Sequence, residues 1–327
     1  MSAVTPFKKA LITGISGQDG AYLAQLLLDK GYQVFGTSRN AGANRFANLV
    51  HLGIKERVAL KTLDVQDFQA VKHHLASGAY DEIYHLASES SVGQSFSHPR
   101  EVILGTQSAT VNILESAREL GLNARFFFAG SSECFGNTGT EMADENTPFH
   151  PRSPYAVAKA AAYWEVANYR ETYGIYACTG ILFNHESPLR PERFVTKKIV
   201  AAACRIAGGS NEKLHLGNIG VIRDWGWAPE YVEAMWRMLQ QQAAEDFVIA
   251  TGESHSLKEY LSLVFESLGL DWHEHVITDA TIMRQSELLE GHSNPSRANK
   301  TLGWRASKRL DEIVKILVNN QKVHIEL

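Results

Sequence analysis

The sequence has few cysteines. Only Cys134, Cys178 and Cys204 occur among 327 residues, and they are widely separated and odd in number. Such cysteines build neither a disulfide framework nor a metal site. We therefore expect a reduced, cytoplasmic protein that binds no metal. The histidines at 73–74 and at 273 and 275 have no further ligands at metal-binding spacing and are interpreted as surface imidazoles.

The sequence also lacks an excess of basic charge and any long apolar run. Its formal net charge is −4. This argues against a nucleic acid or an anionic membrane surface as partner, because both require a basic field. The apolar stretch "IVAAACRIAGG" is interrupted by Arg205 and does not approach a membrane span. The N-terminus shows no apolar core followed by a cleavage site of small residues. We expect a soluble protein that acts on a small molecule.

Strand and helix signals alternate through the first half of the chain. This alternation predicts right-handed βαβ units and an α/β fold with a Rossmann-type, doubly wound parallel sheet. The expected strands are 10–13, 32–36, 58–63, 82–86 and 125–129, and the expected helices are 21–30 and 110–121.

The pattern changes after residue 183, where loops lengthen and helices expected at 196–207 and 229–241 are mixed with short strands. We predict a first domain at 1–182 and a smaller α/β domain at 183–327, with a segment near 224–251 returning to the first. Ligands of open α/β sheets bind beyond the carboxyl ends of the strands. Polar residues at strand ends are therefore the candidates for a site.

A glycine-rich loop, "LITGISGQDG", lies between the first strand and the first helix. Gly14, Gly17 and Gly20 would let the backbone approach a pyrophosphate at the positive end of the helix. The alternative is a tight turn without a ligand, but the strand–helix context favours a dinucleotide.

The second strand ends without the acidic residue that would bind the adenosine ribose of NAD. Arg39 in "GTSRN" suits a 2′-phosphate instead and favours NADP, although it could be an ordinary surface arginine. Asp64, after the third strand, could accept a hydrogen bond from the adenine amino group or simply begin a loop.

A tyrosine and a lysine lie four residues apart in "RSPYAVAKAAAYW". On a helix, Tyr155 and Lys159 share a face, and a nearby ammonium favours the phenolate. Ser131, at a strand end, could bond the same substrate oxygen. A base for the hydroxyl proton beside a nicotinamide is what oxidation of an alcohol requires.

These residues resemble the extended short-chain dehydrogenase/reductase family, and within it the GDP-mannose 4,6-dehydratase branch. The resemblance runs along nearly the whole chain. Its specific stretches include "ALITGISGQDGAYLAQLLLDKGY", "DENTPFHPRSPYAVAK", "GILFNHESPLR", "FVTKKI", "LGNIGVIRDWGWAPEYVEAMWRMLQ" and "EDFVIATGE".

The resemblance implies roles for individual residues. Ser131, Glu133, Tyr155 and Lys159 would be catalytic. The cofactor, NADP or possibly NAD, would be bound by Gly14, Ser16, Gly17, Gln18, Asp19, Gly20, Arg39, Asp64, Val65, Leu86, Ala87, Ser88, Ser90, Lys159, His185 and Arg190. The nucleotide sugar, GDP-mannose, would be bound by Ser90, Asn184, Lys198, Arg223, Arg284 and Glu287. The family also implies a homo-oligomer, either a dimer or a tetramer.

Glu133 follows the hydrophobic run "FFFAGSSECFG", where a strand leaves the core. Oxidation at C4 of the sugar makes the C5 proton acidic, and a carboxylate there could remove it as water leaves from C6. The product would be a 4-keto-6-deoxy sugar. The alternatives are a dehydratase for another nucleotide hexose or heptose, an epimerase or reductase of the same fold, and a non-catalytic NADP-binding sensor or scaffold.

The chain departs from the branch at three places. Arg39 is followed by "NAG" instead of a second arginine, Glu89 in "SESSV" replaces the usual glutamine, and Leu289 replaces an aspartate. Asp224 is interpreted as holding Arg223 or a backbone turn, and Trp225, Trp236 and Trp304 as packing residues.

Overall fold

A computed structural model describes residues 7–283 and 286–325. The chain forms two compact units. Unit 1 comprises the described residues up to Cys134 together with Ser153–Leu182 and Val232–Phe247. Unit 2 comprises Phe135–Arg152, Phe183–Tyr231 and the described residues from Val248 onward. The predicted roles of 1–182 and 183–327 as functional domains stay predictions.

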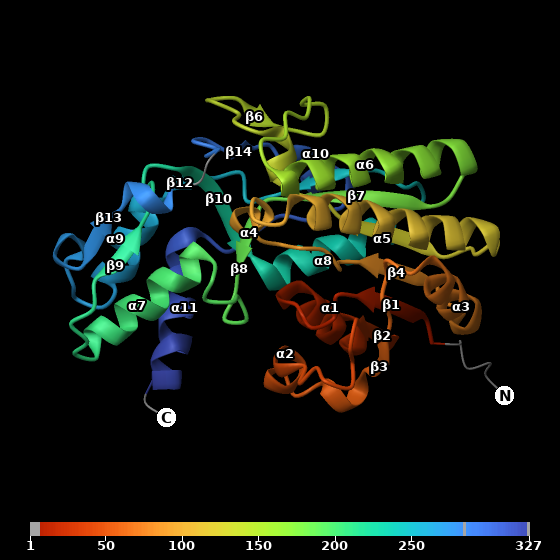
Figure 1. Ribbon diagram of the computed structural model, residues 1–327, viewed down its shortest axis with the longest axis horizontal. Helices are drawn as coiled ribbons and strands as arrows, with labels where there is room; N and C mark the ends of the chain where they lie inside the picture. The colour runs from red at the N-terminus through yellow and green to blue at the C-terminus, as the bar shows by residue number, and fades with distance from the viewer. Residues whose placement is uncertain (1–6, 284–285, 326–327) are drawn as a thin grey trace. The chain divides into compact units, whose positions relative to one another are not determined.

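Unit 1 is built on a seven-stranded sheet in the order β11-β7-β5-β4-β1-β2-β3 (Figure 1). The neighbouring pairs from β7 to β3 are parallel, which confirms the predicted Rossmann-type α/β fold. The strands are β1 (Lys9–Thr13), β2 (Gln33–Ser38), β3 (Ala59–Thr62), β4 (Glu82–His85), β5 (Arg125–Ala129), β7 (Ala177–Leu182) and β11 (Phe247–Ile249), of which only Phe247 belongs to unit 1.

The central strands are buried along almost their whole length. Every residue of β4 and β7 is buried, as are the last four of β5. Continuous apolar runs are typical of a parallel sheet covered on both faces. The register pairs Thr13 with His85 and His85 with Phe128, so these three side chains share one face of the sheet.

Helices cover this sheet, and α5 and α6 lie side by side in Figure 1. The predicted start of a helix at Thr110 was wrong, because α5 begins at Pro99, a proline at the first helical position. The first half of α5 concealed this start, because its apolar residues form the single run 102–104 followed by Gly105 and do not recur at helical spacing. The helices of unit 1 are α1 (Gln18–Asp29), α2 (Ala47–His51), α3 (Phe68–Gly78), α4 (Val92–Ser95), α5 (Pro99–Glu119), α6 (Pro154–Tyr173), most of α8 (Ala228–Met238) and the 3₁₀ turn η1 (Lys55–Arg57).

The segment Val232–Phe247 is bound to unit 1 by partly buried polar contacts. Arg125 donates to the carbonyl oxygen of Gln241 at 3.0 Å, and the Tyr176 hydroxyl donates to that of Met238 at 2.9 Å. Asp246 forms a two-pronged ion pair with Arg170, with N–O distances of 2.9 and 2.8 Å. These bonds explain why a segment distant in sequence belongs to this unit.

Unit 2 contains short strands and a helical core. Its strands pair as β12-β10-β8, β13-β9 and β14-β6. The strands are β6 (Met142–Ala143), β8 (Asn184–Glu186), β9 (Leu214–Leu216), β10 (Ile222–Trp227), β12 (Ser254–Ser256), β13 (Val276–Thr278) and β14 (His292–Ser293). The helices are α7 (Val195–Ala207), α9 (Leu257–Glu266), α10 (Ser296–Thr301) and α11 (Leu310–Ile325), with 3₁₀ turns η3 (Trp272–Glu274) and η4 (Ala280–Ile282).

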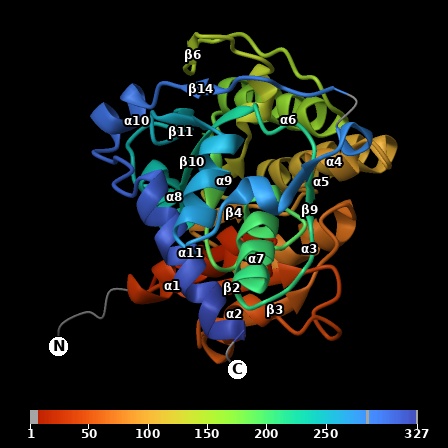
Figure 2. The same cartoon turned by 90° about the vertical axis from the view of Figure 1, so that its left-hand side faces the viewer.

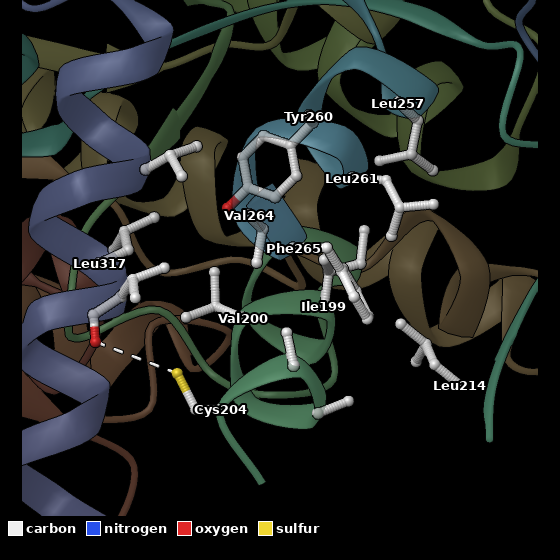
Figure 3. Close-up of a cluster of buried hydrophobic side chains, with 14 of the residues drawn as sticks. Ile199, Val200, Cys204, Leu214, Leu257, Tyr260, Leu261, Val264, Phe265 and Leu317 are labelled. Carbon is white, nitrogen blue, oxygen red and sulfur yellow. Dashed lines mark hydrogen bonds between the residues drawn. The ribbon is translucent and has the colours of Figure 1, made fainter. Parts of the chain in front are cut away.

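Helices α7, α9 and α11 pack against one another in unit 2 (Figure 2). Figure 3 shows the buried side chains between them, with Ile199 and Val200 from α7, Tyr260 and Val264 from α9 and Leu317 from α11. This cluster supplies the rigid support for the polar residues of β8 and β10.

Candidate active site

The glycine-rich loop follows β1 in unit 1, and two of its glycines are required by the chain's own packing. Gly14 has φ +77°, and a Cβ there would lie 2.9 Å from the backbone of Leu86 and Ala87. A Cβ on Gly20 would lie 2.5 Å from the Gly14 carbonyl oxygen. These two glycines allow β1, the loop and α1 to approach closely.

Gly17 is different, because the chain itself does not require a glycine there. Its φ is −73°, and a Cβ would meet only the Gly14 carbonyl oxygen, at 3.4 Å. Gly17 is the N-cap of α1 and makes no side-chain capping bond. The space next to Gly17 is therefore open. The first backbone N–H groups of α1, from Gln18 and Asp19 onward, could bind an anion there.

The other predicted cofactor residues of this region lie at neighbouring strand ends. Ser16 is held by Asn48, whose side-chain amide donates to the Ser16 carbonyl oxygen at 3.0 Å. Arg39 is exposed directly after β2. Asp64 accepts from the backbone N–H of Gln66 at 3.0 Å and so begins the turn before α3. Val65 is buried.

The loop after β4 carries Leu86, Ala87, Ser88 and Ser90. In this loop the Glu89 carboxylate accepts from the backbone N–H groups of Ser90 and Ser91, both at 2.9 Å. Ser91 in turn caps α4. The negative charge that departs from the family pattern is thus compensated by local backbone donors.

Tyr155 and Lys159 lie one turn apart on α6, as predicted. The helix begins with Pro154 at its first position and is capped by Ser153, which accepts from Ala156. The Lys159 ammonium lies 5.8 Å from the centre of the Tyr155 ring.

Lys159 is buried and donates from Nζ to the carbonyl oxygen of Ala129 at 2.6 Å. This bond fixes α6 to the carboxyl end of β5. Burial lowers the pKa of Lys159 from its ordinary value of 10.5 to about 8, because desolvation disfavours the ammonium.

Because burial lowers the pKa of Lys159, the charged form of this side chain destabilises the folded state. Between pH values of about 8 and 10.5 the folded state binds fewer protons than the unfolded chain, so this group's contribution to stability rises with pH. We expect Lys159→Met to raise the free energy of unfolding at neutral pH by on the order of 2 kcal/mol, less above about pH 8. Urea unfolding of the wild type and the variant, at neutral pH and above about pH 8, measures this difference. A less stable variant at neutral pH would contradict it.

Ser131 and Glu133 follow the end of β5, Ser131 directly before the 3₁₀ segment η2 (Ser132–Phe135) and Glu133 within it. The Ser131 hydroxyl accepts from the backbone N–H of Glu133 at 3.3 Å. The thiol of Cys134 contacts the carbonyl oxygen of Ala156 at 3.6 Å. Because Cys134 adjoins Glu133 and Ala156 adjoins Tyr155, the structure brings the predicted acid and the predicted tyrosine to one place in unit 1.

Unit 2 presents a second group of predicted residues on β8. Asn184 and His185 pair in register with Trp225 and Gly226 of β10. His185 is buried, has its Nδ1 2.7 Å from the Phe183 carbonyl oxygen, and stacks on Tyr231 with ring centres 4.5 Å apart. These contacts fix the orientation of the imidazole.

Arg190 lies in the loop after β8. Its Nε is 3.4 Å from a carboxylate oxygen of Glu186, and its guanidinium lies 3.9 Å from the centre of the Phe194 ring. Lys198, on α7, donates to the carbonyl oxygen of His215 at 2.8 Å.

Arg223 on β10 is almost completely buried. It donates to the carbonyl oxygens of Ile222 and Leu288, each at 2.8 Å, and lies 3.8 Å from the Glu287 carboxylate. Arg223 and Glu287, two predicted substrate residues, are thus brought together. Arg284 lies outside the described residues.

Residues 287–294 are bound to neighbouring segments of unit 2 along their length. The backbone N–H of Ile222 donates to Leu289 at 2.7 Å, and the N–H of Gly291 donates back to Ile222 at 3.0 Å. The N–H of Glu290 donates to the Asn137 side chain at 2.8 Å. Strand β14 then pairs with β6. We call residues 287–294 the strap.

Asp224 holds a turn and the strap together, as one of the two sequence interpretations expected. Its carboxylate accepts from the N–H groups of Thr251 and Gly252 and from the Ser293 hydroxyl, the last at 2.6 Å. Burial raises the pKa of Asp224, and these hydrogen bonds oppose that shift. Trp225 and Trp304 are buried packing residues.

His85 was not among the site residues predicted from the sequence. This histidine ends β4, is 1% exposed, and lies 2.8 Å from the Thr13 hydroxyl through Nδ1. No local motif marks it, because its partners come from neighbouring strands. The only signal was a polar residue at the end of an apolar strand.

Within residues 7–283 and 286–325, no cluster of three or more histidine, cysteine, aspartate or glutamate side chains is arranged to hold a metal ion. Across the same ranges, every helix is too short or too polar to cross a membrane.

The parallel sheet, the glycine loop on β1 and the Tyr155–Lys159 pair define a Rossmann-type protein of the short-chain dehydrogenase/reductase class. A family model described as GDP-mannose 4,6 dehydratase matches residues 11–317. The chain is 44% identical to "GDP-mannose 4,6 dehydratase 1" of Arabidopsis thaliana, over 97% of this chain and 90% of that protein. The chain belongs to the GDP-mannose 4,6 dehydratase family.

Solved structures share this fold. The UDP-glucose 4-epimerase of Thermus thermophilus, in complex with NAD, has a TM-score of 0.84 at 24% identity, covering 96% of this chain and 99% of that one. RMD from Pseudomonas aeruginosa, complexed with NADPH, has a TM-score of 0.80 at 20% identity, covering 97% and 99%.

Proposed function

We propose that this protein is a nucleotide-sugar 4,6-dehydratase that converts GDP-mannose to GDP-4-keto-6-deoxymannose. Family membership and the names of its relatives support the substrate and the product. The observation that carries the chemistry is the position of Glu133. It follows β5 in the same short turn as Ser131, next to the point where Cys134 contacts the α6 backbone that bears Tyr155.

In the proposed reaction, Tyr155 takes the proton of the C4 hydroxyl group, and the Lys159 ammonium stabilises the phenolate that does so. A nicotinamide dinucleotide held at the glycine-rich loop would supply the redox chemistry, as acceptor of the hydride from C4 and donor of the same hydride to C6. Glu133 removes the C5 proton and delivers a proton to the hydroxyl that leaves C6 as water. Two protons leave the sugar, one departs in water and one returns to C5, so the protons balance. The reaction is redox-neutral overall because the hydride lost from C4 is regained at C6.

The proposed cofactor is NADP, with NAD as the alternative. The residues fit a dinucleotide, because Gly17 leaves the N-terminus of α1 uncrowded where the chain's own packing needs no glycine. Relatives in fold are described with NAD and with NADPH. The exposed Arg39 after β2 favours the 2′-phosphate of NADP. The proposed cofactor residues of unit 1 are those of the glycine-rich loop and the neighbouring strand ends, and those of unit 2 are His185 and Arg190.

Replacing Arg39 tests the preference for NADP. We expect Arg39→Ala to weaken NADP binding about 10- to 100-fold, the range for one charge-assisted phosphate contact, and to leave NAD binding unchanged. Calorimetric titration with both dinucleotides measures this. Arg57→Ala removes another exposed cation of unit 1 and serves as control. Equal losses for both cofactors would show that Arg39 does not contact the 2′-phosphate.

The proposed sugar-nucleotide residues are Ser90, Asn184, Lys198, Arg223 and Glu287, together with Arg284, which lies outside the described residues. Arg223 is the cation expected to meet the diphosphate, and its geometry is preset by the Ile222 and Leu288 carbonyls. The domain assignment of 1–182 to the cofactor and 183–327 to the nucleotide sugar is part of this proposal.

We also propose that the protein is a homo-oligomer. Leu104 on α5 and Val157 and Trp164 on α6 are 46%, 40% and 63% exposed, and the two helices lie side by side. Large apolar side chains on adjacent helices are typical of an association surface. The mass in solution, measured by light scattering, distinguishes monomer, dimer and tetramer.

The function is tested by incubating the purified protein with GDP-mannose without added reductant. We expect a product lighter by one water. Unchanged GDP-mannose would move the search to other nucleotide hexoses, because the strap carries Leu289 where the family has aspartate. Product formed only at the expense of added nicotinamide would favour a reductase.

A further inference from the structure

His85 lies at the carboxyl end of β4, near the middle of the sheet in unit 1. Its partners in register are Thr13 on β1 and Phe128 on β5, so the three side chains share one face. Thr13 is 0% exposed, and His85 and Phe128 are each 1% exposed. A titratable side chain is therefore buried at the strand ends that lead to the predicted reaction centre.

Only one nitrogen of His85 has a partner. The Nδ1 atom lies 2.8 Å from the Thr13 hydroxyl, which also receives the backbone N–H of Ala87 at 3.4 Å. The Nε2 atom is buried without a hydrogen-bond partner in the part of the chain that the structure describes. A buried polar atom without a partner is costly, and such atoms in folded proteins are usually satisfied by water or serve a function.

The charge that acts on His85 is the ammonium of Lys159. The Lys159 Nζ lies 4.8 Å from the centre of the Phe128 ring, and the His85 ring centre lies 5.8 Å from the same point. Burial, and then the charge of Lys159, lower the pKa of His85 to about 3. His85 is thus neutral at working pH. Lys159 has three N–H donors, and one of them bonds to Ala129.

We propose that His85 is a positioning residue for Lys159, accepting at Nε2 a hydrogen bond relayed from the ammonium through a buried water molecule. In this arrangement Nδ1–H donates to Thr13, and the lone pair of Nε2 faces the positive charge. The hydrogen bond at one ring nitrogen decides the protonation of the other. A buried water between polar groups is a common structural element.

This role rests on the proposed function, because it acts on the pair that carries the first proton transfer. By stabilising the ammonium, His85 keeps Lys159 charged beside Tyr155 despite burial. Cys134 on η2, in its thiolate form, and Asp19 on α1 also raise the pKa of Lys159. Burial raises the pKa of the Cys134 thiol to about 12, so it stays neutral at working pH, and Asp19 supplies the negative charge.

The experiment follows the phenolate of Tyr155 directly. Its near-ultraviolet absorbance is measured against pH, without substrate, as the difference between each protein and the same protein carrying Tyr155→Phe. We expect His85→Leu to move the midpoint of phenolate formation up by about one pH unit, the size of one hydrogen bond to a charged group. We expect His85→Gln, which retains an acceptor, to recover at least half of the shift.

Two further variants provide a second test and a control. Thr13→Val removes the hydroxyl that sets the ring tautomer of His85. It should raise the midpoint of phenolate formation by less than His85→Leu does. This variant tests the proposal if His85→Leu does not fold. His74→Leu is the matched control, because His74 on α3 likewise pairs with a hydroxyl, that of Tyr80 at 2.9 Å. It should leave the midpoint unchanged.

A folded His85→Leu protein with the wild-type midpoint would overturn the proposal, even if its melting temperature fell. Because the titration uses no substrate, its outcome is independent of dehydration. A shifted midpoint in a protein that does not dehydrate GDP-mannose would sustain the role of His85 and reject the proposed function. In an active enzyme, the loss of rate as pH rises through about 8 should begin at lower pH in His85→Leu.

Discussion

Glu133→Gln is expected to lower the formation of the 4-keto-6-deoxy product by about 10²- to 10⁴-fold, the range for losing a positioned acid–base group. The amide has nearly the shape of the carboxylate but cannot accept the C5 proton. Oxidation at C4 does not require this carboxylate. A single turnover should therefore show reduced nicotinamide by absorbance while mass spectrometry finds no loss of water.

Solvent exchange gives a second measurement of the same step. In deuterated water the wild-type protein should return deuterium to C5 of the product, whereas Glu133→Gln should leave C5 unlabelled. Glu141→Gln, which neutralises an exposed carboxylate a few residues downstream, is the matched control and should behave as wild type. Product formed by Glu133→Gln at the wild-type rate would remove Glu133 as the base.

Tyr155→Phe is expected to act one step earlier. Loss of the phenol removes the base for the C4 hydroxyl proton, so the rate should fall about 10²- to 10⁴-fold. No reduced nicotinamide should appear in a single turnover, in contrast to Glu133→Gln. Stopped-flow absorbance with wild type and both variants under identical conditions measures the difference.

The control for Tyr155→Phe is Tyr163→Phe, which removes a hydroxyl two turns further along α6. It should keep wild-type kinetics. Cofactor binding should be unchanged in both tyrosine variants. Rapid nicotinamide reduction by Tyr155→Phe would assign the first proton transfer to another group.

The sequence alone predicted the features that depend on local spacing. Tyr155 and Lys159 were placed on one helical face because they are four residues apart, and the buried strand at 125–129 was recognised from its apolar run. The start of α5 was missed because the apolar residues that follow Pro99 form one run, 102–104, without helical spacing. Local patterns thus located elements well where apolar spacing was strong.

Contacts between distant segments could not be predicted. From the sequence, Glu89 brings a negative charge into the loop after β4. In the structure its carboxylate accepts hydrogen bonds from the backbone N–H groups of Ser90 and Ser91, which compensate that charge. Lys159 reaches the Ala129 carbonyl at the end of β5, and His85 meets Thr13 only because β1 and β4 are neighbours in the sheet. Such bonds depend on tertiary arrangement rather than on residue type.

The strap has a thermodynamic consequence for ligand binding. Residues 287–294 are already fixed by β10, by Asn137 and by Asp224, so Glu287 and Arg223 are ordered before any nucleotide arrives. Under the proposed function, this part of the site loses little conformational entropy on binding. The heat-capacity change of association should then reflect the surface buried by the ligand itself, without the additional heat-capacity decrease that accompanies coupled folding of a loop.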